Sequence, residues 1–551
     1  MEDESSVSKS NQDQPAEGPA LASLSWPFEG GDVGDIGREG RFVTATLGAA
    51  GPDELIARVD AVCICSSDIK IIRMGSSHAL FRERDLSESP VVLGHELAVT
   101  LVDVGANWRH RYRPGQRLGL QPAVLAGSER LTVGVDLPGG LSQFIKLDPT
   151  LLDGERKPYL FDVPPDLSAA EVAMLEPYAC VEAAFRPNSR VGLKEGGRLL
   201  IWGAPDASHH TLSAEVFPAE AVLIDAPPAL ESWARAHTRQ VTVWQGEPAG
   251  DEAFDDIVLC GRHEPARIAA ALRMLRKGGL LAMVAADPNP LPVDVDIARI
   301  HYHEIAVVGA RGPEVDEAFG PARNRFEVKP GGTMLILGAG GAMGRIHTHR
   351  ALELKDGPKR VIATSRKGSR LEALRRDFAP MAKAHGRELV VLEDAELEAA
   401  LSGLGEVDDA VVVAPSVAAV ERAAAMLAPG GMLVVFAGVA MGEPCRLPLS
   451  RIVSDGLRIT GSTGSTVSDQ LGVLERVKRG ELDLTENLEA VAGFDAVPAA
   501  LKAVMEGRFS GKVAIYPGIL GLPLTPVSAL GIGDGRHSRW TIEDERALAG
   551  K

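Results

Sequence analysis

Cysteine is scarce in this sequence of 551 residues, which contains only five. The five stand at positions 63, 65, 180, 260 and 445, and so odd and scattered a set argues against a disulfide framework. It suits a metal site or free thiols in a reducing compartment. We therefore expect the protein to work in the cytoplasm.

Basic residues and long apolar runs are also in short supply. Lys and Arg number 58 against 75 Asp and Glu, and the net charge of −17 disfavours nucleic acid and anionic membranes as partners because both would repel it. No apolar run approaches the roughly 20 residues of a membrane span. The start of the chain, residues 1–14, is acidic and polar, so no signal peptide is expected.

The chain does have length, and it is too long for a single core, so several domains are expected. Residues 1–25 are mostly polar and are predicted to form a disordered tail. Between Arg41 and Leu147, short apolar runs alternate with Gly and Pro turns, which predicts a mostly β domain. A helix at 499–505 and a strand at 512–516 are too short to fold alone, and we expect them to pack back onto the β domain.

An internal repeat organises the middle of the chain. Gly196–Ala204 matches Gly331–Ala339, and Lys277–Ala285 matches Pro429–Ala437. In both copies apolar strands alternate with helical stretches, which indicates two tandem doubly wound α/β domains, each around a parallel sheet. The expected domains are a tail at 1–25, a β catalytic domain at 26–190 completed by 469–520, a first α/β domain at 191–325, a second at 326–468, and a C-terminal tail at 521–551.

A glycine-rich turn in the second copy follows a strand at 334–337 and precedes a predicted helix. Read from Ala339, it is an A-x-G-x-x-G variant of the dinucleotide-binding fingerprint. Glycines let the backbone turn tightly and approach a pyrophosphate, while the N–H groups at the helix start meet the anion. The residues expected to contact the cofactor are Gly338, Gly340, Gly341, Ala342, Met343 and Gly344.

The first copy has lost this turn. Its equivalent contains Pro205, which offers no N–H, and Asp206, which would repel phosphate. Asp225 ends the next strand, where a ribose-binding acid belongs, but without a phosphate cradle we interpret it as vestigial. The first copy is therefore predicted to be a structural or interface domain.

The choice of cofactor depends on the end of the second strand in the working copy. Ser365, Arg366 and Lys367 stand there, and a carboxylate for a ribose hydroxyl does not. These side chains suit a 2′-phosphate, which favours NADP(H), with NAD(H) as the alternative. A solvated basic turn would explain the same residues without a ligand.

A thiol, an imidazole and a carboxylate form the most informative group. Cys65 ends an apolar strand, and His95 and Glu96 follow Gly94, whose conformational freedom permits a bend that aims both inward. Together they make a ligand shell for a catalytic Zn²⁺ with one open position, although a single buried Cys or His is usually part of a core. Glu176 could alternate with Glu96 as a ligand, lie outside the first shell, or simply be a carboxylate at a helix start.

Three residues after Cys65 are candidates for the chemistry. Ser67 could hydrogen-bond the substrate oxygen and pass on its proton, and Asp68 could orient His95. Lys70 could extend the proton relay or meet an anionic substrate. Turn residues that cap the next helix would look the same.

Taken together, Ile64–Lys70, Gly94–Glu96 and Glu176–Cys180 resemble the zinc-dependent medium-chain alcohol/polyol dehydrogenases, sorbitol dehydrogenases and L-sorbose 1-phosphate reductases above all. The resemblance covers about residues 40–520. It implies a GroES-like β catalytic domain split by a Rossmann domain, with the chain end returning to complete it. It also implies zinc on Cys65, His95 and Glu96 or Glu176, Ser67 as the relay hydroxyl, and a homo-oligomer.

The sequence departs from this pattern in several places. No Cys lies between positions 66 and 179, so the structural zinc lobe of many relatives is absent. Lys70 stands where many members have His, Gln116 replaces the usual Asp of a Pro-Gly-Asp-Arg turn, and the extra degenerate copy is unusual.

The sequence thus predicts a zinc enzyme that transfers a hydride between NADP(H) and the alcohol or ketone of a polyol, ketose or sugar phosphate. One alternative is a zinc-free quinone or enoyl reductase, which would not need the three ligands together. The other is a non-catalytic nucleotide-binding module, to which the decay of the first copy lends weight.

Overall fold

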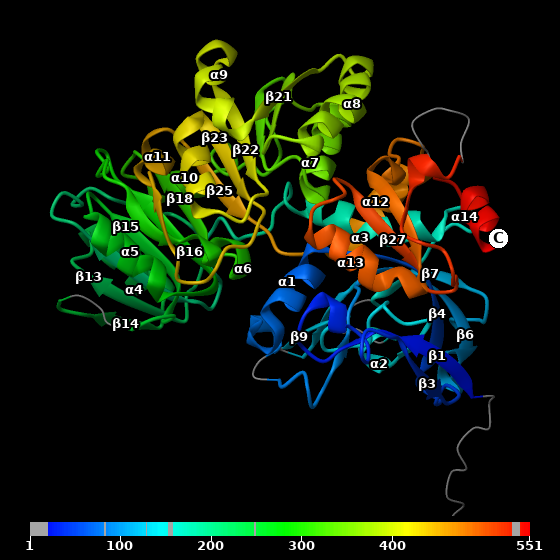
Figure 1. Cartoon of the computed structure of the whole chain (residues 1–551). Helices are drawn as coiled ribbons and strands as arrows, with labels where there is room; N and C mark the ends of the chain where they lie inside the picture. Colours follow the sequence, from blue (N-terminus) through cyan, green and yellow to red (C-terminus); the bar gives the residue numbers. More distant parts are fainter. Residues whose placement is uncertain are drawn as a thin grey trace, which may run out of the picture. The chain divides into compact units, whose positions relative to one another are not determined.

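The computed structural model describes residues 20–81, 84–127, 129–152, 158–246, 250–531 and 540–550. The chain forms two compact units, one of Met1–Glu176 with Gln470–Lys551 and one of Pro177–Asp469. In Figure 1 the first unit is blue to cyan and orange to red, and the second is mainly green to yellow. The chain leaves the first unit at Glu176, earlier than the expected boundary at residue 190.

The first unit is built on an eight-stranded sheet with the order β11-β7-β6-β4-β27-β26-β28 and with β10 also paired to β4. Its strands are β1 (Leu21–Ser25), β2 (Pro27–Phe28), β3 (Val43–Leu47), β4 (Leu55–Cys63), β5 (Val91–Val92), β6 (Glu96–Val104), β7 (Arg117–Leu120), β8 (Ala123–Ala126), β9 (Glu129–Thr132), β10 (Phe144–Leu147), β11 (Leu160–Asp162), β26 (Leu488–Gly493), β27 (Lys512–Tyr516) and β28 (Thr525–Pro526). Its helices are α1 (Ser66–Met74), α2 (Pro149–Leu152), α13 (Val497–Met505) and α14 (Ile542–Ala549), while α3 (Ala169–Ala183) and α12 (Val467–Lys478) cross into the second unit.

The chain end returns to this sheet, where β27 pairs antiparallel with β4. A row of apolar residues in β27, Val513 to Tyr516, lies buried there. Burial of these side chains explains why a strand of five residues is stable in this place although it could not fold alone.

The structure contradicts the predicted bounds of both tails, because part of each predicted tail is folded. Residues 21–25 form β1, which pairs antiparallel with β3, so they are not disordered; residues 1–19 lie outside the described part of the chain. At the other end, β28 pairs with β26, and buried Trp540 donates from Nε1 to Tyr516 Oη at 2.9 Å. The described residues after 520 therefore belong to the first unit.

The second unit contains two parallel six-stranded sheets, as the repeat predicts, with the orders β14-β13-β12-β15-β16-β18 and β21-β20-β19-β22-β23-β25. The first copy contains β12 (Arg198–Gly203), β13 (Glu220–Ile224), α4 (Pro228–His237), β14 (Gln240–Val243), β15 (Phe254–Cys260), α5 (Pro265–Met274), β16 (Leu275–Val284), β17 (Val293–Asp296), α6 (Ile297–Tyr302) and β18 (Ala306–Ala310). The second contains β19 (Thr333–Leu337), α7 (Ala342–Glu353), β20 (Arg360–Ser365), α8 (Ser369–Ala384), β21 (Glu388–Glu393), α9 (Leu397–Leu404), β22 (Val407–Val412), α10 (Val417–Met426), β23 (Leu427–Val435), β24 (Pro444–Leu447), α11 (Ser450–Ser454) and β25 (Arg458–Gly461).

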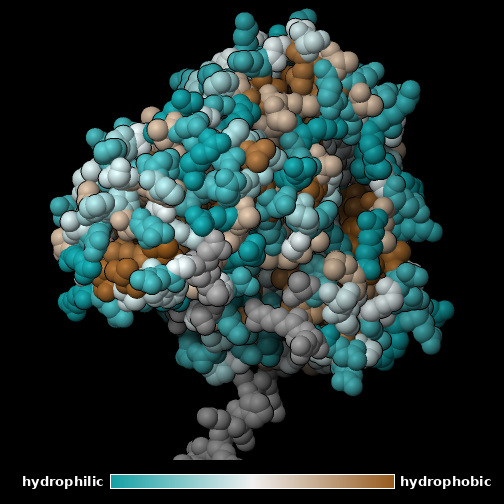
Figure 2. All heavy atoms as spheres, turned by 90° about the vertical axis from the view of Figure 1, so that its left-hand side faces the viewer, coloured by the Kyte–Doolittle hydropathy of each residue, from teal (hydrophilic) through white to brown (hydrophobic). Residues whose placement is uncertain are grey.

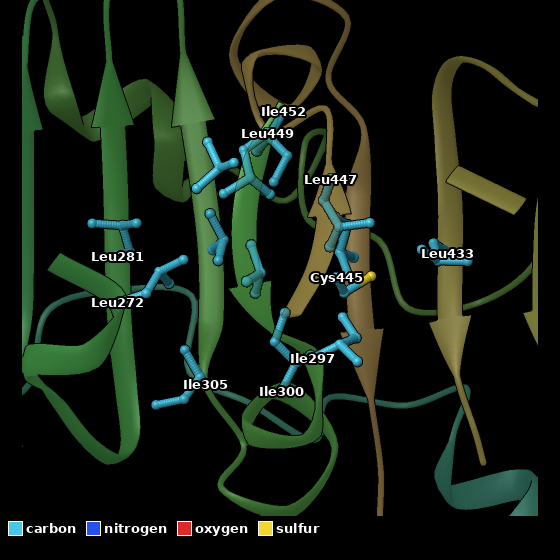
Figure 3. Close-up of a cluster of buried hydrophobic side chains, with 14 of the residues drawn as sticks. Leu272, Leu281, Ile297, Ile300, Ile305, Leu433, Cys445, Leu447, Leu449 and Ile452 are labelled. Carbon is cyan, nitrogen blue, oxygen red and sulfur yellow. The ribbon is translucent and has the colours of Figure 1, made fainter. Parts of the chain in front are cut away.

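The two copies are joined by equivalent elements. β17 of the first pairs antiparallel with β24 of the second, with Val293 opposite Leu447 and Val295 opposite Cys445. Counted back from Gly309 of β18 and Gly461 of β25, Val293 corresponds to Cys445 and Val295 to Leu447. The pairing of the two strands is therefore reciprocal. Reciprocal pairing of equivalent residues is the mark of a local two-fold axis. Figure 3 shows the shared apolar core around this axis.

Paired arginines support this equivalence. Arg299 of α6 donates to the carbonyl of Leu272 at 2.7 Å, and Arg451 of α11 donates to that of Ala424 at 3.3 Å. Both pairs are separated by the same number of residues and occupy matching places in their copies. The repeat seen in the sequence is therefore also a repeat of tertiary contacts.

The face of the molecule drawn in Figure 2 is largely hydrophilic, with several separate hydrophobic groups. Across the described ranges, no helix has both the length and the apolar character needed to cross a bilayer.

Candidate metal and dinucleotide sites

The three predicted metal ligands converge in the first unit. β4 and β6 pair antiparallel with Cys63 opposite Glu96, which brings Cys65, just beyond β4, to the start of β6. Gly94 has φ +96°, the left-handed conformation that permits the expected bend before His95. As a result the ligand atoms of Cys65, His95 and Glu96 all lie within 4.8 Å of one another.

Asp68 and Ser67 surround His95 from the first turn of α1. Asp68 Oδ1 lies 3.4 Å from His95 Nδ1, and its Oδ2 accepts the Cys65 backbone N–H at 2.9 Å. Asp68 therefore caps the helix and also contacts the imidazole. Ser67 Oγ lies 3.3 Å from His95 Nε2.

The electrostatics of the group favour a cation. Burial opposes protonation of His95, but the negative charges of Asp68 and Cys65 outweigh it, so the pKa of His95 lies well above its usual value. A site that raises the proton affinity of an imidazole in this way also attracts a metal ion, which competes for the same nitrogen.

Lys512 is a residue of this site that the sequence analysis missed. It begins β27, and its Nζ is hydrogen-bonded to Glu96 Oε1. Both side chains are almost fully buried, at 2% and 1% exposure. Burial would lower the pKa of Lys512, but the Glu96 charge raises it above its usual value. A lysine at the start of an otherwise apolar strand was the available signal, because a buried charge needs a partner.

Glu96 keeps one oxygen for another ligand. Its Oε2 is buried and has no hydrogen-bond partner among the described residues. Leaving a carboxylate oxygen without a partner in a dry site is unfavourable, and a divalent cation would satisfy it. The thiol, the imidazole and this oxygen fit zinc by their chemistry.

Glu176 is not brought into the cluster. Glu176 is buried in the middle of α3 rather than at a helix start, which corrects our expectation of a carboxylate stabilised by the helix dipole. It is not among the residues whose ligand atoms form the cluster. Lys70 lies on α1, and its charge lowers the pKa of His78, while burial is the larger cause of that shift.

The glycine-rich turn of the second copy has the geometry that a pyrophosphate needs. Gly338 directly follows β19 with φ +88°, and Gly341 is the N-cap of α7, which begins at Ala342. A Cβ atom on Gly344 would lie 2.4 Å from the carbonyl oxygen of Gly338, so only glycine allows the helix to pack this closely. A Cβ atom on Gly341 would meet nothing within 4 Å, which leaves the backbone N–H groups open to an anion.

The predicted 2′-phosphate residues lie at the end of β20, next to this turn. A Cβ atom on Gly340 would lie 2.2 Å from Ser365 Oγ and 3.2 Å from the Cβ atom of Arg370. Arg366 and Lys367 follow Ser365 and are exposed. Arg370, in the first turn of α8, is a further basic residue here that the sequence analysis did not single out.

Comparisons with known proteins agree with this arrangement. Residues 51–152 match the model of the alcohol dehydrogenase GroES-like domain. The chain is 24% identical to L-sorbose 1-phosphate reductase of Klebsiella pneumoniae over 316 residues, which cover 51% of this chain and 74% of the relative. It is 25% identical to sorbitol dehydrogenase of Bacillus subtilis over 296 residues, which cover 49% and 79%.

The fold also has solved counterparts. One is a candidate zinc-binding dehydrogenase of Sinorhizobium meliloti 1021 bound to NADP, with a TM-score of 0.51, 16% identity, and coverage of 90% of this chain and 100% of that one. These likenesses support the medium-chain alcohol/polyol dehydrogenase superfamily, and residues 51–152 match its GroES-like domain. The resemblance and the fold class stated from the sequence are both confirmed.

The chain carries its glycine-rich turn in one copy only. Residues 204–219 of the first copy are all described and form no helix, so the anion-binding helix start is missing there altogether. Asp206 occupies the turn instead, and its Oδ1 accepts the Arg262 backbone N–H at 2.9 Å. Asp225 directly follows β13, the second strand of this copy, with a left-handed φ of +46°.

Proposed function

We propose that this protein is a zinc-dependent oxidoreductase that transfers a hydride between NADP(H) and the alcohol or ketone of a polyol, ketose or sugar phosphate. The observation that carries the proposal is the convergence of Cys65, His95 and Glu96, beside the Ser67 hydroxyl. The names of the relatives, a sugar-phosphate reductase and a sorbitol dehydrogenase, support the substrate class.

In this proposal Cys65, His95 and Glu96 bind the metal, and Glu176 remains a candidate for exchange with Glu96. Bound zinc would act as a Lewis acid on the substrate oxygen. Asp68 contacts the His95 ring at Nδ1, so Nε2, which lies 3.3 Å from Ser67 Oγ in the structure, would be the nitrogen offered to the metal.

In this proposal Ser67 transfers the hydroxyl proton of the substrate. During oxidation a bound NADP+ would accept the hydride from the substrate carbon. The hydroxyl proton of the substrate would pass to Ser67 Oγ, and Ser67 would pass its own proton on to solvent. Lys70 either extends this path or meets an anionic group of the substrate. Reduction runs through the same steps in reverse.

The second copy binds the cofactor in this proposal. The pyrophosphate lies on the start of α7, and Ser365, Arg366 and Lys367 bind the 2′-phosphate of NADP(H), with NAD(H) as the weaker alternative. All five cysteines are free thiols, which supports a cytoplasmic location. A homo-oligomeric state, implied by the resemblance, stays a prediction.

Metal analysis combined with turnover tests the proposal. We expect about one zinc per chain and NADPH-dependent reduction of a ketose or a ketose phosphate. Cys65→Ala should lose both the zinc and the turnover, while Cys260→Ala, which changes another thiol in the second unit, should keep both. A zinc-free protein active on quinones would support the alternative reductase, and NADPH binding without turnover would support a binding module.

A further inference from the structure

The first copy reaches across to the second at the end of α6. His301 Nδ1 lies 3.1 Å from the carbonyl oxygen of Val435, and a Cβ atom on Gly461 would lie 3.1 Å from His301 Cα. A Cβ atom on Gly438 would lie 1.8 Å from Tyr302 Oη. The Tyr302 hydroxyl therefore rests directly against the loop that follows β23 of the second copy.

This contact lies at the carboxyl edge of the working sheet, since Val435 and Gly461 are the last residues of β23 and β25. In the strand order β21-β20-β19-β22-β23-β25, the predicted 2′-phosphate site ends β20 and the pyrophosphate turn follows β19. A dinucleotide spans the sheet across such a switch point, so its other half extends over β22, β23 and β25. Tyr302 thus stands where the nicotinamide half would lie.

The contact is not repeated on the other side of the local two-fold axis. Counted from Gly309 of β18 and Gly461 of β25, His301 corresponds to Val453 and Tyr302 to Ser454. A Cβ atom on Gly309, in the first copy, would lie 2.9 Å from Val453 Cγ2. The copy without a dinucleotide turn thus receives an aliphatic side chain, and the copy with the turn receives an imidazole and a phenol.

We propose that the degenerate first copy is kept as part of the cofactor site, in which Tyr302 hydrogen-bonds the nicotinamide half of the dinucleotide. This inference rests on the proposed function. His301 anchors the arrangement, because its ring lies at 81° to that of Tyr302 with centroids 4.5 Å apart. Tyr302 is 37% exposed as a residue, so part of it is open to a ligand. Burial raises the pKa of Tyr302, which keeps the hydroxyl protonated as a donor.

The test compares two ligands that share the adenosine half. Dissociation constants for NADPH and for adenosine 2′,5′-bisphosphate would be measured by calorimetry on the full-length protein and on Tyr302→Phe, which keeps the ring. We expect about three- to tenfold weaker NADPH binding, as for loss of one hydrogen bond, and unchanged binding of the bisphosphate. Ser454→Ala, at the equivalent position, should change neither constant.

Equal NADPH affinity of Tyr302→Phe and the unaltered protein would overturn the inference and leave the proposed function standing. An equal loss for both ligands would also overturn it, because Tyr302 would then act only by supporting the packing of the two copies. If the unaltered protein bound neither ligand, the proposed function and the inference would fall together.

Discussion

The buried ion pair between Lys512 and Glu96 provides the sharpest prediction about the metal site. In Lys512→Met, a side chain of similar length without the charge replaces lysine, and Glu96 is left buried and unpaired. Breaking such a pair costs about 3–5 kcal/mol, because the remaining charge is neither solvated nor compensated. In metal-free protein we therefore expect the first unit to lose about that much stability.

Urea unfolding and amide hydrogen exchange in β6 would measure this loss. Lys478→Met is the matched control, since Lys478 pairs with Glu475 at 2.7 Å but both side chains are about half exposed, at 46% and 53%. A surface pair of this kind contributes about 1 kcal/mol at most. Adding Glu96→Gln to Lys512→Met should restore part of the lost stability because the orphaned charge is gone.

Zinc supplies a second readout. The ion would replace the missing positive charge beside Glu96, so saturating zinc should stabilise Lys512→Met more than the unaltered protein. Binding at 100 times the dissociation constant adds about 2.7 kcal/mol. The reasoning is refuted if Lys512→Met loses no more stability than Lys478→Met, or if zinc stabilises both proteins equally.

Two further predictions concern the second unit. Arg366→Ala should lower the preference for NADPH over NADH about tenfold or more, as for loss of a charged hydrogen bond. Arg375→Ala, a control within α8, should leave this preference unchanged. The ratio of kcat/KM for the two coenzymes measures the preference, and an unchanged ratio in Arg366→Ala contradicts the assignment. Burial lowers the pKa of His263 to about 4. Because the unfolded chain takes up this proton below about pH 6.5 and the folded chain does not, stability should fall by roughly 2 kcal/mol between pH 6.5 and 5. His263→Gln should remove that part of the pH dependence in urea unfolding, and an identical slope in both proteins would rule out this origin.

The sequence allowed the candidate metal ligands and the glycine-rich turn to be picked out because their signals are local. Cys65 follows an apolar strand, Gly94 stands just before His95, and the turn after β19 lies between a strand and a helix. Steric and hydrogen-bonding requirements at such places act over a few residues, so they leave a readable pattern. The duplication was readable for the same reason, since each strand repeats its own apolar run.

Other features depend on contacts between residues far apart in the chain, which the local sequence pattern does not predict. Lys512 is 416 residues from Glu96, and the two meet only because β27 adds to the sheet beside β4. Leu21–Ser25 were assigned to a polar tail, because the local sequence does not show that they pair with β3. Glu176 was interpreted as a carboxylate at a helix start, yet α3 continues through Glu176 and Pro177.

By itself the sequence determined the parallel sheets, the loss of the dinucleotide turn in the first copy and the three residue types of the candidate metal site. Tertiary structure alone decided that Lys512 faces Glu96 and that Tyr302 of one copy rests on Gly438 of the other. The physical reason is that burial and pairing energies depend on which surfaces meet, and two surfaces that meet after folding need not lie near each other along the chain.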